Sequence, residues 1–384
     1  MITKISNKLL DLIFNFYVNT ALIIIAWSIS KKNDNNKSAG IMALPYYSEN
    51  YPGGSTRIAN WKEYFQRDGI VFDVYWASES HNFLSCFYSQ NPFKRYFFFI
   101  KVFNSRLKLI RKIKNYKVIW VQRAFIPFYP FKEAIVEKLI KKINPNIIFD
   151  FYDADYASNY NLTIDSAKMA SKVTVASIYL QNYFNKINPR TELVPFAMNF
   201  EDYKKKEYLS KSKIVIGWMG SPDNFKNVLD IQDSLVQIEN RNPQVQFVFI
   251  CRDEFKLKLN NVRFKKWSDK QFNYHEEISL FDIGISPVIQ KSEDNYAKTT
   301  FKVLEFMSSG VAFVSSPLGI PDKIVHQKNA LIADNEFDWI DCLQSLIDDF
   351  ELRKKLGGQA FKTISGEYSY SKIYKQLNKI LSFK

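Results

Sequence analysis

Two lysines and a glutamate are placed to do chemistry in the segment NYAKTTFKVLEFMSSG, residues 295–310, which has the pattern of a short helix. The spacings of +4 and +3 put Lys298, Lys302 and Glu305 on one stripe, because residues three and four apart lie above one another on a helix. Lysine in a first helical turn opposes the helix dipole, unless an anion binds there to free N–H groups and the ammonium together. The stretch therefore predicts an anion site. A solvated stripe with a Lys–Glu pair is the alternative that this segment alone leaves open.

The rest of this segment predicts the helix that carries the three residues. Apolar side chains recur at helical spacing, Thr299 or Thr300 precedes them, and Gly310 follows the last one. Such a helix is mostly buried, and its charged stripe is then the part that can meet a ligand.

Strands and helices alternate on both sides of a charged stretch near residues 205–212. Before it, stretches such as VFDVYWA, VIWVQRA and NIIFDFYDADY predict strands with helices between them. After it, the alternation restarts with IVIGWMGS, VQFVFIC and DIGISPV. Strands separated by helices imply parallel sheets covered on both faces. The predicted fold class is therefore α/β, with two Rossmann-like doubly wound domains facing each other across a cleft where a phosphate-bearing ligand would fit.

A chain of 384 residues is too long for one typical core and suggests two domains of ordinary size. We expect residues 1–38 to form a membrane-associating segment and linker, residues 39–207 a first Rossmann-like domain, and residues 208–365 a second one that binds the ligand. Residues 366–384 are expected to form a helix that packs back on the first domain.

The net charge of +14 indicates a polyanionic partner. The segment Phe93–Lys117 is rich in Lys and Arg, has no acidic residue, and interleaves its cations with aromatic and aliphatic side chains. This pattern is typical of helices at the surface of an anionic membrane, and a solvated helix beside a core is the alternative. No nucleic-acid-binding motif supports a nucleic acid partner.

The apolar stretch at residues 12–29, LIFNFYVNTALIIIAWSI, also points to a membrane. It is borderline for a span, which needs about 20 apolar residues, because Asn15, Asn19 and Thr20 interrupt it. No signal-peptide cleavage site is evident after it. We favour an uncleaved membrane-associating segment, with a buried helix of the fold as the alternative and the question of a span left open.

The cysteines and histidines disfavour several kinds of chemistry. Cys86, Cys251 and Cys342 lie far apart and form no metal pattern, so they read as small core residues in a reducing compartment. The few histidines form no HExxH motif, and no GxSxG nucleophile elbow occurs. We therefore expect no metal site, and we disfavour hydrolases of these types.

The stretches FDIGISPV, NYAKTTFKVLEFMSSGVAFVSSPLGIPDKIV and NALIAD, with the loop IGWMGSPDNFKNV, resemble the donor-binding half of GT-B-fold glycosyltransferases of family 4, the glycosyl transferases group 1. STRIANWKEYF, VQRAFIPFYP and IIFDFYDADY resemble, more loosely, the acceptor domain of that family. The resemblance covers residues from about 40 to 370. It implies transfer of a sugar from a nucleotide sugar with retention of anomeric configuration, without a cofactor or an essential metal.

The resemblance also implies roles for individual residues. Glu305 matches the second glutamate of the E-x7-E motif, which holds the nucleotide ribose, and Lys298 and Lys302 would face the diphosphate. The donor-binding residues that the glycine loop would add are Gly217, Gly220, Ser221 and Lys226. Stabilising a leaving diphosphate is an electrostatic task for which fixed cations can substitute for a divalent metal.

One position departs from the family motif. The first glutamate of E-x7-E falls at Ala297, which has no carboxylate, and "AK" here resembles a subset of the family with a GK-type sequence. In the first domain, Asp153 and Asp155 follow a predicted strand and are candidates to contact acceptor hydroxyls, and Arg123 is a candidate for an acceptor phosphate. Helix capping and an internal ion pair are the alternatives for these three.

Together these features predict a hexosyltransferase at the cytoplasmic face of a bacterial inner membrane. It would move a sugar onto a glycan or a lipid-linked acceptor for surface polysaccharide. A nucleotide-sugar epimerase on the same fold is an alternative, which the shortage of histidine disfavours. A non-catalytic subunit that binds a nucleotide sugar or glycan is another, motivated by Ala297.

Overall fold

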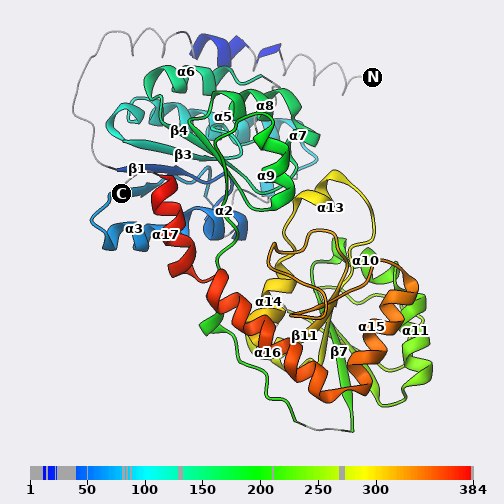
Figure 1. The fold of residues 1–384 in the computed structure, drawn as a ribbon. Helices are drawn as coiled ribbons and strands as arrows, with labels where there is room; N and C mark the ends of the chain where they lie inside the picture. Colours follow the sequence, from blue (N-terminus) through cyan, green and yellow to red (C-terminus); the bar gives the residue numbers. More distant parts are fainter. Residues whose placement is uncertain are drawn as a thin grey trace. The chain divides into compact units, whose positions relative to one another are not determined.

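The structure is a computed structural model that describes residues 12–13, 16–21, 23, 40–49, 51–79, 83, 85–86, 89–128, 133–209, 212–267 and 273–381. The chain divides into two compact units (Figure 1). Unit 1 comprises the chain to Val175, Leu180–Val194 and the C-terminal end from Leu377. Unit 2 comprises Ala176–Tyr179 and Pro195–Gln376. The chain therefore passes from unit 1 into unit 2 at Pro195, before the charged stretch near residues 205–212.

Unit 1 is built on a parallel sheet whose strands run in the order β2-β1-β3-β4-β5-β6. The strands are β1 (Ile41–Leu44), β2 (Phe72–Val74), β3 (Val118–Gln122), β4 (Ile147–Phe151), β5 (Lys172–Val175) and β6 (Thr191–Leu193). The strand order reverses once, between β1 and β3. Strands β1, β3 and β4 are buried along their whole length, as expected for a parallel sheet covered on both faces.

Helices and 3-10 turns connect these strands. They are α2 (Pro52–Arg57), η1 (Ala59–Trp61), α3 (Lys62–Arg67), α5 (Pro92–Ile110), η2 (Ile113–Asn115), α6 (Ile135–Ile143), α7 (Asp155–Ser158), α8 (Tyr160–Met169) and α9 (Ile178–Asn185). The stretch STRIANWKEYFQRDGI, residues 55–70, contains the end of α2, then η1 and α3, and does not form one continuous helix. The end of the C-terminal helix α17 (Tyr370–Ile380) belongs to this unit, where Asn378 Nδ2 donates to Asp68 Oδ2 at 3.2 Å.

A buried ion pair ties the α2 region to the centre of the unit 1 sheet. Arg57 is 2% exposed, and its Nε donates to Asp150 Oδ2 at 3.1 Å. Asp150, within β4, also accepts a hydrogen bond of 2.7 Å from Thr174 Oγ1. Removing one partner of such a pair leaves an uncompensated buried charge. The ion pair therefore holds the end of α2 against β4 of the sheet.

Unit 2 contains a second parallel sheet, in the order β12-β11-β10-β7-β8-β9. The strands are β7 (Ile214–Met219), β8 (Val245–Ile250), β9 (Val262–Lys265), β10 (Ile283–Ser286), β11 (Ala312–Ser315) and β12 (Leu331–Ile332). Counted along the chain of this unit, the order is 6-5-4-1-2-3, so the direction of winding reverses between β7 and β10. Parallel sheets of this type bind ligands at that reversal, beyond the carboxyl ends of the strands.

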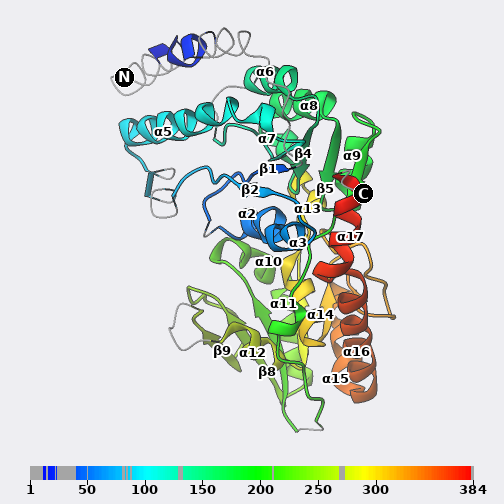
Figure 2. The same cartoon turned by 90° about the vertical axis from the view of Figure 1, so that its left-hand side faces the viewer.

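Helices cover both faces of this sheet (Figures 1 and 2). They are α10 (Lys226–Leu229), α11 (Gln232–Arg241), α12 (Tyr274–Ser279), α13 (Glu293–Ala297), α14 (Phe301–Ser309), α15 (Glu336–Asp348) and α16 (Phe350–Glu367), with the 3-10 turns η3 (Phe200–Asp202) and η4 (Pro222–Asn224). The two sheets confirm the predicted α/β class with two Rossmann-like domains.

The segment of residues 295–310 differs from the single helix that its pattern predicts. Helix α13 ends at Ala297, Lys298 has an extended backbone with ψ 155°, and α14 begins at Phe301. Gly310 ends α14 in the left-handed conformation with φ 67°, as the sequence indicated. Lys302 is therefore the first-turn lysine, and Lys298 lies in the link before the helix.

The charged stretch near residues 205–212 is packed on unit 2 where it is described. Lys206 is 7% exposed, and its ammonium lies 2.9 Å from Asp282 Oδ1. Its backbone N–H donates to Ser309 O, and Tyr208 Oη donates to Gly310 O at 2.9 Å. A buried, paired lysine explains why this stretch can be charged and still belong to the core of a domain.

Candidate functional site

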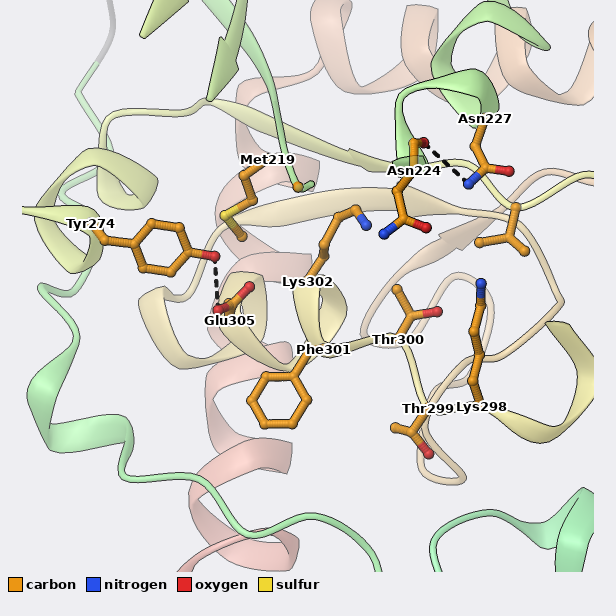
Figure 3. A pocket seen from close by; sticks show the side chains of 12 residues that line it. Met219, Asn224, Asn227, Tyr274, Lys298, Thr299, Thr300, Phe301, Lys302 and Glu305 are labelled. Atoms are coloured by element: carbon orange, nitrogen blue, oxygen red, sulfur yellow. Dashed lines mark hydrogen bonds between the residues drawn. The ribbon is translucent and has the colours of Figure 1, made fainter. Parts of the chain in front are cut away.

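A pocket of about 300 Å³ opens in unit 2 at the reversal between β7 and β10 (Figure 3). Its described lining residues are Met219, Gly220, Asn224, Asn227, Tyr274, Val288, Lys298, Thr299, Thr300, Phe301, Lys302 and Glu305. The lining comes from the end of β7, from the η4–α10 turn, from the loop after β10 and from the start of α14. The pocket therefore lies where the topology of a doubly wound sheet predicts a ligand.

The link between α13 and α14 places three polar residues of the pocket lining just before the N-terminal end of α14: Lys298, Thr299 and Thr300. Thr300 N–H donates to Gly319 O at 2.6 Å. Gly319 has φ 65°, and a Cβ at this position would lie 3.0–3.1 Å from atoms of residues 295–300. Only glycine easily adopts this positive φ and also fits into so little space. Gly319 therefore allows the link between α13 and α14 to pack closely against the loop that contains Gly319.

Lys302 is the cation closest to the glycine turn of the pocket. Its Nζ lies 5.4 Å from the centre of the Trp218 ring, and among the described residues it forms no salt bridge. Burial lowers its pKa to about 8. The first backbone N–H groups of α14 lie on the same turn and lack intrahelical acceptors. The ammonium and these N–H groups together make a site for an anion.

Glu305 lies one turn further along α14, and only 9% of it is exposed. Tyr274 Oη donates to its Oε1 at 2.8 Å, from the start of α12. Burial raises the pKa of the Glu305 carboxyl to about 7, while the Tyr274 hydrogen bond and the charge of Lys302 oppose that rise. One carboxylate oxygen is thus fixed by Tyr274, and a hydroxyl-bearing ligand can donate to the other.

Gly220 lets Lys302 reach the turn after β7. A Cβ on Gly220 would lie 2.8 Å from the Trp218 ring and 3.4 Å from Lys302 Nζ. Any side chain here would crowd the ring and the ammonium at once. The glycine therefore gives a ligand and Lys302 close access to the same stretch of backbone.

Two buried polar atoms of the lining have no hydrogen-bond partner among the described residues. They are Asn227 Oδ1 and Thr300 Oγ1, on side chains that are 4% and 6% exposed. Asn227 Nδ2 donates to Asn224 O at 3.2 Å, which orients the amide (Figure 3). Buried polar atoms are nearly always paired, so a polar ligand in the pocket is their natural partner.

Three of the predicted donor-binding residues are not among the described lining residues. Lys226 is exposed on α10, and the next residue, Asn227, lines the pocket instead. Gly217 lies inside β7, where a Cβ would lie 2.2 Å from the Phe281 ring, so this glycine is required for packing. Ser221 Oγ accepts a hydrogen bond of 2.8 Å from Asn224 Nδ2, and so supports the turn that carries Asn224.

Ala297, where the resemblance expects a glutamate, is fully buried at the end of α13. Its carbonyl accepts a hydrogen bond of 2.6 Å from Ser177 Oγ. The neighbouring Glu293 accepts a hydrogen bond of 2.8 Å from Tyr179 Oη, and it is not among the described lining residues. Glu305 is therefore the sole acidic residue in the part of the lining that the structure describes.

The acceptor-side candidates lie together in unit 1, at the carboxyl ends of β3 and β4. Arg123 has φ 61°, and its Nε donates to Asp155 Oδ1 at 2.5 Å. Its Nη2 lies 3.5 Å from Asp153 Oδ2, and the rings of Tyr46 and Tyr152 are each centred 5.2 Å from its guanidinium carbon. The guanidinium is thus held in the internal ion pair that the sequence left open. An acceptor role for these residues stays a prediction.

Sequence reasoning missed the polar residues that complete the pocket. Tyr274 precedes its partner Glu305 by 31 positions, and no local pattern links the two. Asn227 and Thr300 were not selected as site residues, because the nearby lysines Lys226 and Lys298 gave the stronger signal for binding an anion. In Figure 3, Glu305 and Tyr274 lie on one side of Lys302, and Lys298 and the two asparagines lie on the other. A ligand with both hydroxyls and an anionic group suits this arrangement.

Residues 213–349 match the family model described as "Glycosyl transferases group 1". This match covers most of unit 2 and all of the described lining of the pocket. A search of the curated proteins gives no match.

Solved structures with a similar fold include a glycosyltransferase from Rickettsia africae, with a TM-score of 0.64 and 13% identity over 91% of this chain and 100% of that one. Anabaena HepE, crystallised with UDP and glucose, matches with a TM-score of 0.59 and 14% identity over 90% of this chain and 100% of the HepE chain. At these identities the likeness shows the fold, which is the GT-B fold of two Rossmann-like domains. The family match in addition makes residues 213–349 similar to a glycosyl transferases group 1 domain.

Proposed function

We propose that this protein is a retaining glycosyltransferase of family 4, of hexosyltransferase type, that transfers a sugar from a nucleotide sugar to a glycan or lipid-linked acceptor in bacterial surface polysaccharide synthesis. The observation that carries the proposal is the placement of Lys302 and Glu305 in one buried pocket, at the reversal of a doubly wound sheet, within the segment that matches the family. The UDP and glucose bound by the structurally similar HepE support this class of ligand.

In this proposal Lys302 acts on the leaving group. Transfer breaks the bond between the anomeric carbon and the diphosphate oxygen, and the electron pair stays on the diphosphate. The acceptor hydroxyl oxygen forms the new bond to the anomeric carbon, and its proton passes to the departing diphosphate oxygen. Negative charge thus grows on the diphosphate, where Lys302, Lys298 and the first N–H groups of α14 stabilise it. Because these cations are fixed, the proposal requires neither an essential metal nor a cofactor.

Glu305 binds the donor through the nucleotide ribose in this proposal. A carboxylate accepts hydrogen bonds from two neighbouring hydroxyls, and such bonds to a charged acceptor are stronger than neutral ones. Tyr274 occupies Oε1, so the ribose meets a carboxylate whose orientation is already set. Asn227 Oδ1 and Thr300 Oγ1 are further groups that the donor can satisfy.

A non-catalytic subunit that binds a nucleotide sugar is the second candidate. It is favoured by Ala297, which is buried and supplies no carboxylate to the described lining. Turnover separates the two candidates: release of nucleoside diphosphate from a nucleotide sugar, with or without an acceptor, supports the enzyme. Tight donor binding with no release under any acceptor condition supports the binding subunit.

For location we propose the cytoplasmic face of a bacterial inner membrane. The basic segment Phe93–Lys117 and the apolar residues near the N-terminus support it. Among the described residues, no helix has the length and apolar character needed to cross a bilayer.

Donor binding is expected to raise the thermal stability of the protein. A ligand at a hundred times its Kd stabilises the folded state by about 2.7 kcal/mol. Screening nucleoside diphosphates and nucleotide sugars by thermal shift should therefore identify the base and then the sugar. The Lys226→Met variant, whose lysine is exposed outside the lining, should keep the shift and serves as the control. Absence of a shift with every nucleoside diphosphate would contradict the proposed donor site.

Replacing Tyr274 by Phe is expected to weaken donor binding about tenfold, because it removes one hydrogen bond to a charged group. Its effect should appear mainly in the KM for the donor, with kcat little changed. Because the Tyr274 hydrogen bond also lowers the pKa of Glu305, the acid limb of the pH profile should move to higher pH.

Tyr179→Phe is the matched control for this variant. It removes another Tyr–Glu hydrogen bond of 2.8 Å, from Tyr179 to Glu293, whose residues do not belong to the described lining. An equal loss in both variants, or an unchanged pH profile in Tyr274→Phe, would show that Tyr274 does not position Glu305.

A further inference from the structure

Helix α5 carries two large apolar side chains that do not belong to any core. Phe93 is 64% exposed and Phe97 is 72% exposed. They are four residues apart, so they lie above one another on the same stripe of the helix. The buried residues of the helix, Val102 and Phe103 among them, lie on its other side and attach it to unit 1.

The helical residues near the N-terminus present a second exposed apolar stripe. Leu12, Phe16 and Ile23 are 68%, 75% and 70% exposed. Their spacings of +4 and +7 place them on one side of a helix. Val18, by contrast, is 1% exposed and lies on the other side, so the apolar stripe points away from the protein.

The two stripes belong to helical segments that contact each other. Tyr17 Oη donates to Asn104 Oδ1 at 2.6 Å, and the ring of Tyr17 packs edge-on against Phe103 at 6.1 Å. Asn104 is seven residues after Phe97, two turns along the same face of α5. Figure 2 shows the dark-blue N-terminal residues beside α5. The two helical segments that carry the exposed apolar side chains are therefore packed against each other.

Exposed cations lie in a row beside the apolar stripe of α5. Lys94, Lys101 and Lys108 are exposed and repeat every seven residues, beside the stripe of Phe93 and Phe97. The sequence from Phe93 to Lys117 contains no acidic residue that could neutralise them. A surface of apolar side chains rimmed by unopposed cations complements an anionic lipid surface. A second copy of this basic surface would be repelled by it.

We propose that α5 and the described helical residues near the N-terminus, 12–13, 16–21 and 23, form one membrane-docking surface, which lies in the plane of an anionic bilayer with Leu12, Phe16, Ile23, Phe93 and Phe97 among the acyl chains. Lys94, Lys101 and Lys108 meet the lipid headgroups. The surface deepens the proposed membrane location, because it makes the two segments a single interfacial anchor. It does not depend on catalysis.

The test is flotation of the full chain with vesicles of phosphatidylglycerol and phosphatidylcholine, compared with vesicles of phosphatidylcholine alone, at physiological salt. The wild type should bind the anionic vesicles more tightly. F93S/F97S should lower the vesicle partition coefficient about tenfold or more, because two apolar side chains leave the bilayer. K94E/K101E should weaken binding to the anionic vesicles and remove most of their advantage over phosphatidylcholine.

Two matched controls lie in unit 2. F337S changes a phenylalanine that is 77% exposed on α15, and K354E changes an exposed lysine on α16. Both should leave vesicle binding unchanged. The thermal shift with nucleoside diphosphates, measured on every variant, should stay that of the wild type, so failure of docking is distinguishable from failure of the donor site.

Three results would overturn the inference. One is a wild type that does not float with anionic vesicles. Another is an equal loss of binding in F337S and in F93S/F97S. The third is a wild type that forms dimers which F93S/F97S dissociates, with vesicle binding unchanged, because the surface would then be covered by a second copy of the chain.

Discussion

Lys302→Met is expected to lower kcat/KM for sugar transfer about 100- to 1,000-fold, the cost typical of removing one preorganised group that stabilises charge in a transition state. The ammonium lies in the pocket beside Trp218 and Gly220, and no protein carboxylate pairs with it among the described residues. Its attraction for the diphosphate therefore grows as the leaving group gains charge. Steady-state kinetics with the donor that the thermal shift identifies would measure the loss.

Lys226→Met is the matched control for this experiment, since it removes a lysine of the same glycine turn that is exposed outside the lining. Transfer by this variant should stay within about twofold of the wild type, because exposed charges are screened by water and salt. Lys298→Met should fall between the two, since Lys298 lines the pocket but lies in the link before α14, outside the first turn of the helix. Equal activity in Lys302→Met and Lys226→Met would remove Lys302 from the mechanism.

Most of the fold could be predicted because parallel strands that are buried on both faces have continuous runs of apolar residues in the sequence. Apolar stretches such as IMAL, VIWVQ and VQFVFI are unfavourable in water, and polar or charged turns separate them. The edge strands β9 and β12 were not predicted, because they lack such an apolar run. β9 is partly exposed and carries Arg263, and β12 is two residues long, so neither has the apolar run of a central strand.

The candidate site could be predicted only where its residues are neighbours in sequence. Lys302 and Glu305 are one turn apart on α14, so helical spacing alone brings them together. Lys298 was placed on the same helix, but α13 ends before it, because its extended backbone and the bond from Thr300 to Gly319 form a separate link. Tyr274 and Asn227 come from other elements, and their approach depends on tertiary packing that spacing does not encode.

The two buried charged groups of the pocket, Glu305 and Lys302, are expected to reduce stability at neutral pH. The pKa of Glu305 is about 7 in the folded protein, above its ordinary 4.5, so the folded state binds the extra proton between these values and loses stability as pH rises toward 7. The pKa of Lys302 is about 8, below its ordinary 10.5. Between those values the unfolded state binds the extra proton, so stability rises again above pH 8. The contribution of the pair is least favourable between pH 7 and 8.

The double variant Glu305→Gln/Lys302→Met should therefore be more stable than the wild type by about 1 kcal/mol or more near pH 7.5, because it removes two desolvated charges and a change of one pKa unit corresponds to about 1.4 kcal/mol. Its advantage should shrink at about pH 5, where Glu305 is neutral anyway, and at about pH 10, where Lys302 is. Denaturant unfolding of both proteins across this range would measure it, because other titrating groups cancel in the difference. A variant that is less stable than the wild type, or a difference independent of pH, would contradict this. A more stable protein without transfer activity would show that the pocket keeps two desolvated charges for its ligand and not for its fold.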